Sequence, residues 1–406
     1  WSVMGHDVTV VSQERAPERY DLGGAATVRP ELPDDLLPVF VLDDYAGLDA
    51  RLLQDFTAEE RHRYVAANVA SLRELLPADL VFANHVLMGG AVGAALGERF
   101  RIKAHGSELE YSVRGRQALE EWARVSLAAA EAVFVGSQHI REVLEDVVGH
   151  IDRVWEVPPG VDVDEFVIQR RDEALADLLA EAALDPPNPG NAQERRPDED
   201  NAARLAEFFA DERPTVVYFG KLIENKGVQL VLEALDSLDA RVVIVGFGDY
   251  RPELERLAVG LEPGRALLTG PLEHRHLVHL LPLADAAVVP SIFPEAFGMV
   301  AAEAAACGCP PVVARHSGLA EVASGLEEVY PPHLRHLASF NTGDAADLRK
   351  KLVALFALND ADRRVLGAAA RSAVEARWSW TSVAARLLAP VSYEDCNRDH
   401  TERGID

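Results

Sequence analysis

Short apolar runs rich in β-branched residues alternate with longer amphipathic stretches along most of the chain. This alternation predicts parallel strands that are connected by helices. In the first half, the apolar runs predict strands over residues 7–13, 37–43, 80–85, 100–106, 132–137 and 153–160. In the second half, a further series predicts strands over residues 215–221, 240–248, 266–271, 284–291, 310–316 and 337–342. The pattern therefore predicts an α/β protein with two Rossmann-like, doubly wound parallel-sheet domains.

The two series predict a first domain over residues 1–166 and a second over residues 214–384. Residues 167–213 between them are dense in charge and contain "DPPNPGNAQERRPDED", whose Pro and Gly residues forbid a continuous helix. We expect an acidic linker enlarged by an insertion, with short helices at "DEALADLLAEAA" and "NAARLAEFFA". A helix at about 385–400 has an apolar face that is expected to pack on the first domain. Because ligands of such sheets bind at the carboxyl ends of the strands, we expect both domains to face a central cleft.

The first residues read "WSVMGHDVTVVSQ", which is typical of the end of a helix that enters a second strand. A βαβ unit needs a strand before that helix. We therefore expect the N-terminal strand of the first sheet to be missing from the chain.

Composition narrows the possible partners. The chain has 406 residues and a formal net charge of −26, which argues against nonspecific binding to nucleic acid or to anionic lipid. No apolar run reaches membrane-spanning length and no signal peptide is evident, so we expect a cytoplasmic protein without stable membrane insertion. Three cysteines are too few for a disulfide framework. Cys307 and Cys309 lack nearby histidines, so buried packing is favoured over a metal site.

Two lysines follow the first predicted strand of the second domain, in "FGKLIENKGV". Lys221 stands at the carboxyl end of the strand, and Lys226 precedes a helix expected to begin near Val228. Two ammonium groups beside a helix N-terminus can bind a diphosphate, because the helix dipole and free N–H groups add to the two charges. The alternative is a pair of solvated surface lysines.

Two carboxylates flank the start of another predicted helix, in "PEAFGMVAAEAAACGCP". Glu295 precedes a helix expected to begin near Met299, and Glu303 lies about one turn inside it. Carboxylates accept paired hydrogen bonds from vicinal diols, so the two acids could hold the hydroxyls of a ribose or a hexose. Alternatively, Glu295 caps the helix and Glu303 is a surface residue.

The stretch "PEAFGMVAAE" is similar to the E-x7-E signature of family 4 of the retaining glycosyltransferases with a GT-B fold. "FGKLIENKGV", "VIVGFGDY", "LTGPLEHRHL" and "VPPGVDVDEF" resemble other landmarks of that family, in the same order. The resemblance extends from Gly5 to about Leu388. It implies a nucleotide-sugar donor, such as a UDP- or GDP-sugar, held by the second domain. It also implies an acceptor glycan, lipid or small molecule held by the first.

The resemblance also implies roles for individual residues. Lys221 and Lys226 would bind the donor diphosphate, Glu303 the ribose hydroxyls and Glu295 a hydroxyl of the transferred sugar. His105 in "KAHGSELEY" matches a histidine of the family that lies near the reacting sugar; the alternative is a buried structural histidine. The remaining contacts are implied for main-chain atoms, near the sugar and phosphate at Phe297, Gly298 and Met299, and near the base at Gly270, Pro271 and Leu272.

The expected chemistry is retaining sugar transfer without a metal or other cofactor. The departing diphosphate gains negative charge, which the two lysines and the helix N-terminus would stabilise. The resemblance favours a front-face mechanism, in which the leaving phosphate takes the acceptor proton, over Glu295 as a covalent nucleophile. Two alternatives remain: another GT-B nucleotide-sugar enzyme such as an epimerase, and a noncatalytic sugar-nucleotide binding protein.

Overall fold

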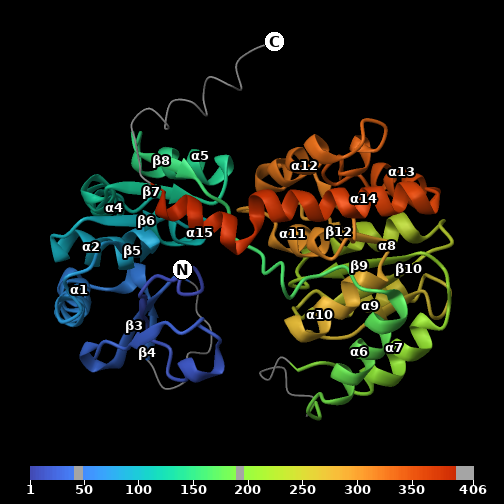
Figure 1. Cartoon of the computed structure of the whole chain (residues 1–406), viewed down its shortest axis with the longest axis horizontal. Coiled ribbons are helices and arrows are strands. Elements are labelled where there is room, and N and C mark those ends of the chain that lie inside the picture. Colours follow the sequence, from blue (N-terminus) through green and yellow to red (C-terminus); the bar gives the residue numbers. More distant parts are fainter. Residues whose placement is uncertain (41–48, 189–195, 390–406) are drawn as a thin grey trace. The chain divides into compact units, whose positions relative to one another are not determined.

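The computed structural model describes residues 1–40, 49–188 and 196–389 (Figure 1). The chain divides into two compact units. The first consists of Trp1–Val157 with a segment that begins at Ala384, and the second of Pro158–Val383. The expected boundary at residue 166 thus differs from the observed division, which lies between Val157 and Pro158.

The strands of the first unit form three parallel sheets. A four-stranded sheet has the order β5-β6-β7-β8, and two smaller sheets pair β1 with β2 and β3 with β4. These strands are β1 (Thr9–Val11), β2 (Ala26–Val28), β3 (Leu36–Val39), β4 (Asp49–Leu52), β5 (Val81–Asn84), β6 (Phe100–Lys103), β7 (Ala132–Val135) and β8 (Val154–Glu156). The helices are α1 (Ala58–Arg73), α2 (Gly90–Leu96), α3 (Gly106–Glu108), α4 (Gln117–Ala129) and α5 (Gln138–Val148).

The core of the first unit lies around β6 and β7, whose residues are all buried. Phe100 and Ile102 of β6 pack with apolar residues of α4 and α5. Helix α15 (Trp380–Leu388) ends at this sheet, because the Arg101 guanidinium donates hydrogen bonds to the carbonyls of Leu387 at 2.6 Å and Ala389 at 3.0 Å. Part of the helix expected at about 385–400 therefore packs on the first unit, and its residues from 390 onward lie outside the described chain.

The second unit contains one six-stranded parallel sheet in the order β11-β10-β9-β12-β13-β14. Its strands are β9 (Thr215–Phe219), β10 (Arg241–Val245), β11 (Ala266–Leu268), β12 (Ala286–Val289), β13 (Pro311–Ala314) and β14 (Ser339–Phe340). Its helices are α6 (Arg171–Ala183), α7 (Asn201–Phe209), α8 (Val228–Leu235), α9 (Arg251–Ala258), α10 (His274–Leu280), α11 (Met299–Ala306), α12 (Ser317–Val329), α13 (Ala345–Phe356) and α14 (Asp360–Ala373). The strand order reverses between β9 and β12, which is the topological switch point where doubly wound sheets bind ligands.

Residues 167–213, expected to form a linker, are part of the second unit. The two short helices expected there are α6 and α7, which pack against each other, while α6 also packs on α10 (Figure 1). Ala174, Leu178 and Leu205 are fully buried in the main apolar core. Arg171, Asp172 and Glu173 at the start of α6 are exposed, while the apolar faces of both helices join the domain.

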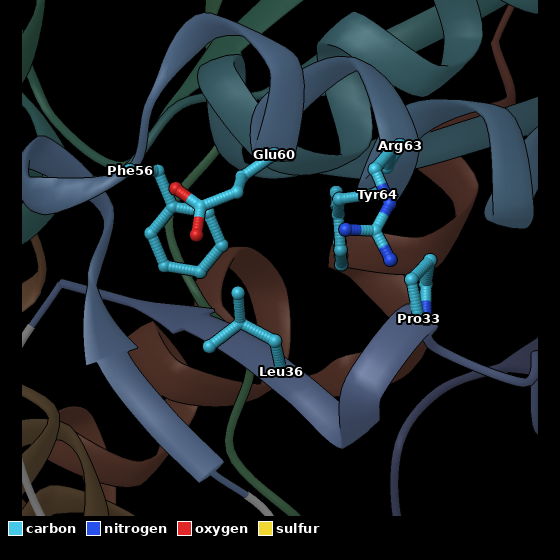
Figure 2. Close-up of a pocket in the computed structure, with 6 residues that line it drawn as sticks. All are labelled: Pro33, Leu36, Phe56, Glu60, Arg63 and Tyr64. Atoms are coloured by element: carbon cyan, nitrogen blue, oxygen red, sulfur yellow. The ribbon is translucent and has the colours of Figure 1, made fainter.

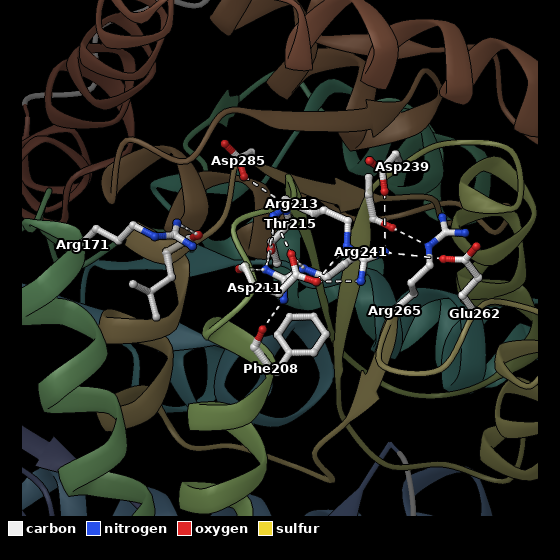
Figure 3. Close-up of polar contacts among 12 residues, drawn as sticks. Arg171, Phe208, Asp211, Arg213, Thr215, Asp239, Arg241, Glu262, Arg265 and Asp285 are labelled. Atoms are coloured by element: carbon white, nitrogen blue, oxygen red, sulfur yellow. Dashed lines mark hydrogen bonds and ion pairs between the residues drawn. The ribbon is translucent and has the colours of Figure 1, made fainter.

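A buried arginine anchors the end of α7 to the amino ends of the strands (Figure 3). Arg241 at the start of β10 has no exposed surface, and its guanidinium lies 4.4 Å from the ring centre of Phe208. It donates hydrogen bonds to the carbonyl of Asp211 at 2.6 Å and to the Thr215 hydroxyl at 3.1 Å. It also donates to the carbonyl of Phe208. This network lies at the edge of the sheet opposite to the carboxyl ends.

Every predicted strand coincides with an observed strand, although the observed strands are shorter. Residues 41–43 of the strand predicted over 37–43 lie outside the described chain. The sequence did not predict β2 and β4, which are short and contain no buried residue. The expectation of one doubly wound sheet in the first domain differs from the three separate sheets observed.

Candidate functional site

The two predicted lysines lie in the loop that follows β9. Lys221 is exposed, and its carbonyl accepts a hydrogen bond from the Tyr218 hydroxyl at 2.8 Å. Its ammonium group makes no ion pair with any residue that the structure describes. Lys226 ends a short 3-10 helix (Glu224–Lys226), and α8 begins two residues later, as expected.

This loop packs closely on the loop that follows β12, which contains Glu295. Gly227 has a φ of +70°, and a Cβ atom built on it would lie 2.1 Å from the Pro290 carbonyl oxygen, so only glycine fits. The Asn225 carbonyl accepts a hydrogen bond from the N–H of Ile292 at 2.9 Å. These contacts bring Lys226 Nζ to 2.5 Å from Glu295 Oε1.

Glu295 is therefore engaged by Lys226 and does not cap α11. The N-cap of that helix is Gly298, and the helix begins at Met299 as predicted. The side chains of Lys226 and Glu295 are 31% and 20% exposed to solvent, so a ligand can reach the pair.

Glu303 is buried on α11, with only 8% of its surface exposed. Its Oε1 lies 3.8 Å from Nε2 of His274, the first residue of α10. Burial raises the pKa of the Glu303 carboxyl above its usual range, and His274 opposes this shift. The rest of the helix is almost entirely apolar, so Glu303 is a carboxylate placed in an otherwise apolar setting and not a surface residue.

The six predicted main-chain contact residues lie at the same edge of the sheet, after β11 and β12. Phe297 is buried, with its ring centre 5.6 Å from that of Trp378, while Gly298 and Met299 are half-buried. Gly270 is buried and accepts a hydrogen bond from the N–H of Gly246 at 2.9 Å. Pro271 and Leu272 are half-buried.

The segment before α7 packs against Gly270. The Asp198 N–H donates a hydrogen bond to the Thr269 carbonyl at 2.8 Å, and the Asn201 side-chain amide donates to the same oxygen at 2.8 Å. Asp198 also forms a bidentate ion pair with Arg251, with distances of 2.8 and 2.7 Å. The part of residues 167–213 nearest to α7 is therefore a wall beside Gly270, which the sequence analysis did not anticipate.

In the first unit, His105 lies at the carboxyl end of β6, as predicted, next to a second histidine. Its ring centre is 4.6 Å from that of His85, which follows β5. Glu108 has no exposed surface and accepts hydrogen bonds from the N–H groups of His105 at 3.1 Å and Val86 at 2.7 Å. Burial, followed by the charge of His85, lowers the pKa of His105 to about 4.

The sequence analysis missed His85 and Glu108. The signal for His85 was available, because it ends the strand predicted over 80–85 and the carboxyl ends of neighbouring parallel strands meet at one edge. Glu108 carried no such signal, because only the fold shows that its carboxylate reaches the N–H groups of both strand ends.

The first unit also contains a small pocket between β3 and α1 (Figure 2). The Glu60 carboxylate and the Phe56 ring face Leu36 across it, and Arg63 and Tyr64 lie on the opposite side. Glu60 is paired with Arg51 at 2.5 Å and belongs to a capping box with Thr57 at the start of α1. The Glu60 carboxylate therefore already pairs with Arg51 and stabilises the N-terminus of α1.

Within the described part of the chain, no three His, Cys, Asp or Glu side chains gather closely enough to hold a metal ion. Cys307 and Cys309 are buried free thiols, which agrees with the packing role expected for them; Cys396 lies outside the described residues. None of the described helices is both long and apolar enough to cross a membrane.

The chain resembles known glycosyltransferases in both of its units. A family model described as Glycosyltransferase Family 4 matches residues 2–165, and one described as Glycosyl transferases group 1 matches residues 200–371. The chain is 33% identical over 274 residues to a D-inositol 3-phosphate glycosyltransferase of Xylanimonas cellulosilytica. That match covers 64% of this chain and 57% of the relative, so the chain spans little more than half of that relative's length.

A second relative is the GDP-mannose-dependent monoacylated alpha-(1-6)-phosphatidylinositol monomannoside mannosyltransferase of Corynebacterium glutamicum. It is 27% identical over 315 residues, which cover 74% of this chain and 72% of the relative. Among solved structures, the sucrose-phosphate synthase of Thermosynechococcus elongatus superposes with a TM-score of 0.65 at 21% identity. That superposition covers 99% of this chain and 91% of the synthase and shows a shared fold. The chain has the GT-B fold and belongs to glycosyltransferase family 4.

Proposed function

We propose that this chain transfers a sugar from a nucleotide-sugar donor to an acceptor hydroxyl, with retention of configuration and without a metal ion. The observation that carries the proposal is the pairing of Lys226 with Glu295 close to the start of α11, at the carboxyl edge of the six-stranded sheet. Glu303 lies on the same helix. The site thus combines positive charge for a diphosphate with carboxylates for sugar hydroxyls.

Each residue has a proposed role toward the donor. Lys221 and Lys226 bind the diphosphate, and the N–H groups at the start of α11 add their partial positive charge. Glu303 accepts hydrogen bonds from the ribose hydroxyls, and its apolar surroundings make each such bond stronger than it would be in water. Glu295 accepts a hydrogen bond from a hydroxyl of the transferred sugar.

Main-chain atoms complete the proposed donor site. The N–H groups of Phe297, Gly298 and Met299 contact the sugar and the phosphate. The main chain of Gly270, Pro271 and Leu272 lines the base, with the Asp198 segment behind it.

In the proposed reaction, the bond between the anomeric carbon and the leaving phosphate oxygen breaks, and the sugar gains oxocarbenium character. The two lysines and the helix N-terminus stabilise the negative charge that develops on the diphosphate. The acceptor oxygen attacks from the same face, and its proton passes to the leaving phosphate. Because Glu295 is held by the Lys226 ammonium group, its carboxylate is a weakened nucleophile, which favours this front-face mechanism over a covalent intermediate.

His105 is proposed to donate a hydrogen bond near the reacting sugar. Since the pKa of His105 is lowered to about 4, its ring is uncharged near neutral pH. Such a ring can donate from one nitrogen without adding a fixed positive charge beside the oxocarbenium ion.

The relatives' names favour particular substrates for a first experiment. Both named relatives act on acceptors that contain inositol, and one is named for GDP-mannose. We therefore propose a UDP- or GDP-sugar as donor and a hydroxyl of an inositol-containing small molecule, glycan or lipid as acceptor.

A two-step experiment tests the function. Thermal shift with UDP-, GDP- and ADP-sugars identifies the donor, because a ligand at 100 times its Kd stabilises the folded state by about 2.7 kcal/mol. Transfer to inositol phosphate and phosphatidylinositol is then followed, and the anomeric configuration of the product is determined by NMR. Donor binding without transfer to any acceptor would indicate a sugar-nucleotide binding protein, and conversion of the donor sugar without an acceptor would indicate an epimerase.

A further inference from the structure

The turn that follows β13 contacts the Glu295 loop through a continuous chain of hydrogen bonds. His316 and Ser317 are the N-cap and the first residue of α12. The Glu295 N–H lies 2.9 Å from Ser317 Oγ, and Ser317 Oγ lies 3.0 Å from His316 Nδ1. His316 Nε2 lies 2.7 Å from the carbonyl oxygen of Ser291.

The chemistry of these atoms sets the direction of every hydrogen bond. The Ser291 carbonyl can only accept, so His316 Nε2 carries a hydrogen, and in the neutral ring it carries the only one. His316 Nδ1 then accepts from the Ser317 hydroxyl, whose oxygen accepts from the Glu295 N–H. The main chain of the loop is therefore held on both sides of Pro294, at Ser291 and at Glu295.

The backbone of Ser317 is in a conformation that favours glycine. Its φ is +46°, in the left-handed region that residues with a Cβ atom rarely adopt. A glycine would adopt this φ without strain. The feature that serine supplies and glycine lacks is the hydroxyl group, and that hydroxyl joins His316 to Glu295. Strain of this kind persists where the surrounding structure maintains it, and it clusters at functional sites.

We propose that Ser317 and His316 are positioning residues that hold Glu295 in place for sugar transfer. The Glu295 carboxylate meets Lys226 at 2.5 Å, so a shift of its main chain would move that carboxylate away from both the lysine and the transferred sugar. The inference rests on the proposed role of Glu295 toward the donor sugar. Neither Ser317 nor His316 contacts the substrate in this proposal.

Two variants at one position separate the hydroxyl from the backbone conformation. Ser317→Gly removes the hydroxyl and relieves the strained φ, whereas Ser317→Ala removes the hydroxyl and keeps the strain. We expect Ser317→Gly to have a Tm equal to or above that of the wild type and Ser317→Ala to have a lower one. Both should lower kcat for transfer by on the order of 10- to 100-fold, because small displacements of a positioned group have large effects on rate. The Kd of the nucleoside diphosphate, which lacks the sugar, should be unchanged in both.

Ser324→Ala is the matched control. Ser324 lies on the same helix, and its hydroxyl donates to the Ala320 carbonyl at 2.9 Å within that helix. This variant should transfer sugar at the wild-type rate. Hydrogen exchange at the Glu295 amide provides a readout that does not depend on activity, and exchange should be faster in both Ser317 variants.

A wild-type kcat in Ser317→Gly would overturn the proposal. Loss of transfer in Ser317→Ala but not in Ser317→Gly would also overturn it, because the backbone conformation and not the hydroxyl would then determine the rate. Unchanged amide exchange at Glu295 would also overturn it. If the proposed function itself were wrong, the same experiments would give a different result. In that case the wild-type chain itself would transfer no sugar to any acceptor, while the Glu295 amide would still exchange faster in the Ser317 variants.

Discussion

Lys226 Nζ lies 2.5 Å from Glu295 Oε1, although the two residues are 69 positions apart in the chain. The contact joins the loop after β9 to the loop after β12, the two strands between which the sheet order reverses. The carboxylate keeps the lysine in place before a donor binds, and its remaining lone pairs are available for a sugar hydroxyl. In the proposed function, the pair thus places a cation for the diphosphate next to a carboxylate for the transferred sugar.

Removal of either proposed donor contact should weaken donor binding. Lys226→Ala removes a charge from the diphosphate site, and Glu303→Ala removes the acceptor of the ribose hydroxyls. Each should weaken binding of the nucleotide-sugar by about 1.5–3 kcal/mol, as measured by calorimetry, with unchanged circular dichroism. Lys350, an exposed lysine on α13, provides the control, and Lys350→Ala should bind as the wild type does. Wild-type affinity in the Lys226 or Glu303 variant would refute the role assigned to that residue.

Sugar transfer should survive removal of divalent cations. In the proposed function, Lys221, Lys226 and the N-terminus of α11 supply the positive charge for the diphosphate, so the proposed reaction uses no bridging cation. The measurement is the rate of transfer in excess EDTA, compared with the rate in Mg²⁺ and in Mn²⁺. Loss of activity in EDTA that either ion restores would contradict metal independence.

The stability of the chain should depend on pH through His105. Burial and the neighbouring His85 lower the pKa of His105 from 6.5 to about 4. Between these values the unfolded chain binds more protons than the folded chain, so the free energy of unfolding should fall as the pH falls from about 6.5 to about 4. His105→Gln should reduce this slope in urea unfolding experiments across the same window. An identical slope in the variant would show that the pKa of His105 is not lowered in the folded chain.

A comparison of two glycines tests the wall beside Gly270. Gly264 and Gly270 have φ values of +80° and +70°, but a Cβ atom on Gly270 would lie 2.7 Å from Asp198 Oδ1, and one on Gly264 would meet nothing within 4 Å. Gly264→Ala should destabilise the protein by about 1–2 kcal/mol, from the left-handed conformation alone. Gly270→Ala should cost more, because the Asp198 segment must also move. Equal losses in chemical denaturation would mean that Asp198 does not pack on Gly270.

Arg241 should be far more important for stability than an exposed arginine of the same unit. Arg241→Ala leaves the carbonyls of Phe208 and Asp211 without their donor and creates a cavity, so we expect a loss of about 2–5 kcal/mol. Arg256 is 68% exposed and pairs with Glu253 on the same helix, and Arg256→Ala should change stability by less than about 1 kcal/mol. Similar losses in both variants would contradict the anchoring role of Arg241.

The sequence by itself determined the succession of strands and the residues that follow them. Runs such as 215–221 and 284–291 have uninterrupted apolar centres, VVYF and AAVV, because β9 and β12 are buried on both faces, so their composition predicts them directly. Once the strands were located, Lys226 and Glu295 were expected at the carboxyl edge of the second sheet and His105 at that of the first, since parallel strands present their carboxyl ends together. The short strands β2 and β4 escaped prediction because neither contains a buried residue and neither forms an apolar run.

Only the tertiary structure decided which of these residues meet. The contact of Lys226 with Glu295 depends on two loops packing at Gly227, and the contact of His105 with His85 depends on how β5 and β6 pair. Only the tertiary structure also showed that residues 167–213 belong to the second unit. Their charge and proline content resemble those of a linker, yet α6 and α7 bury apolar faces in the second unit. Local patterns record whether a side chain prefers water or the core, and they do not record which distant segment will cover it, because that depends on the packing of the whole domain.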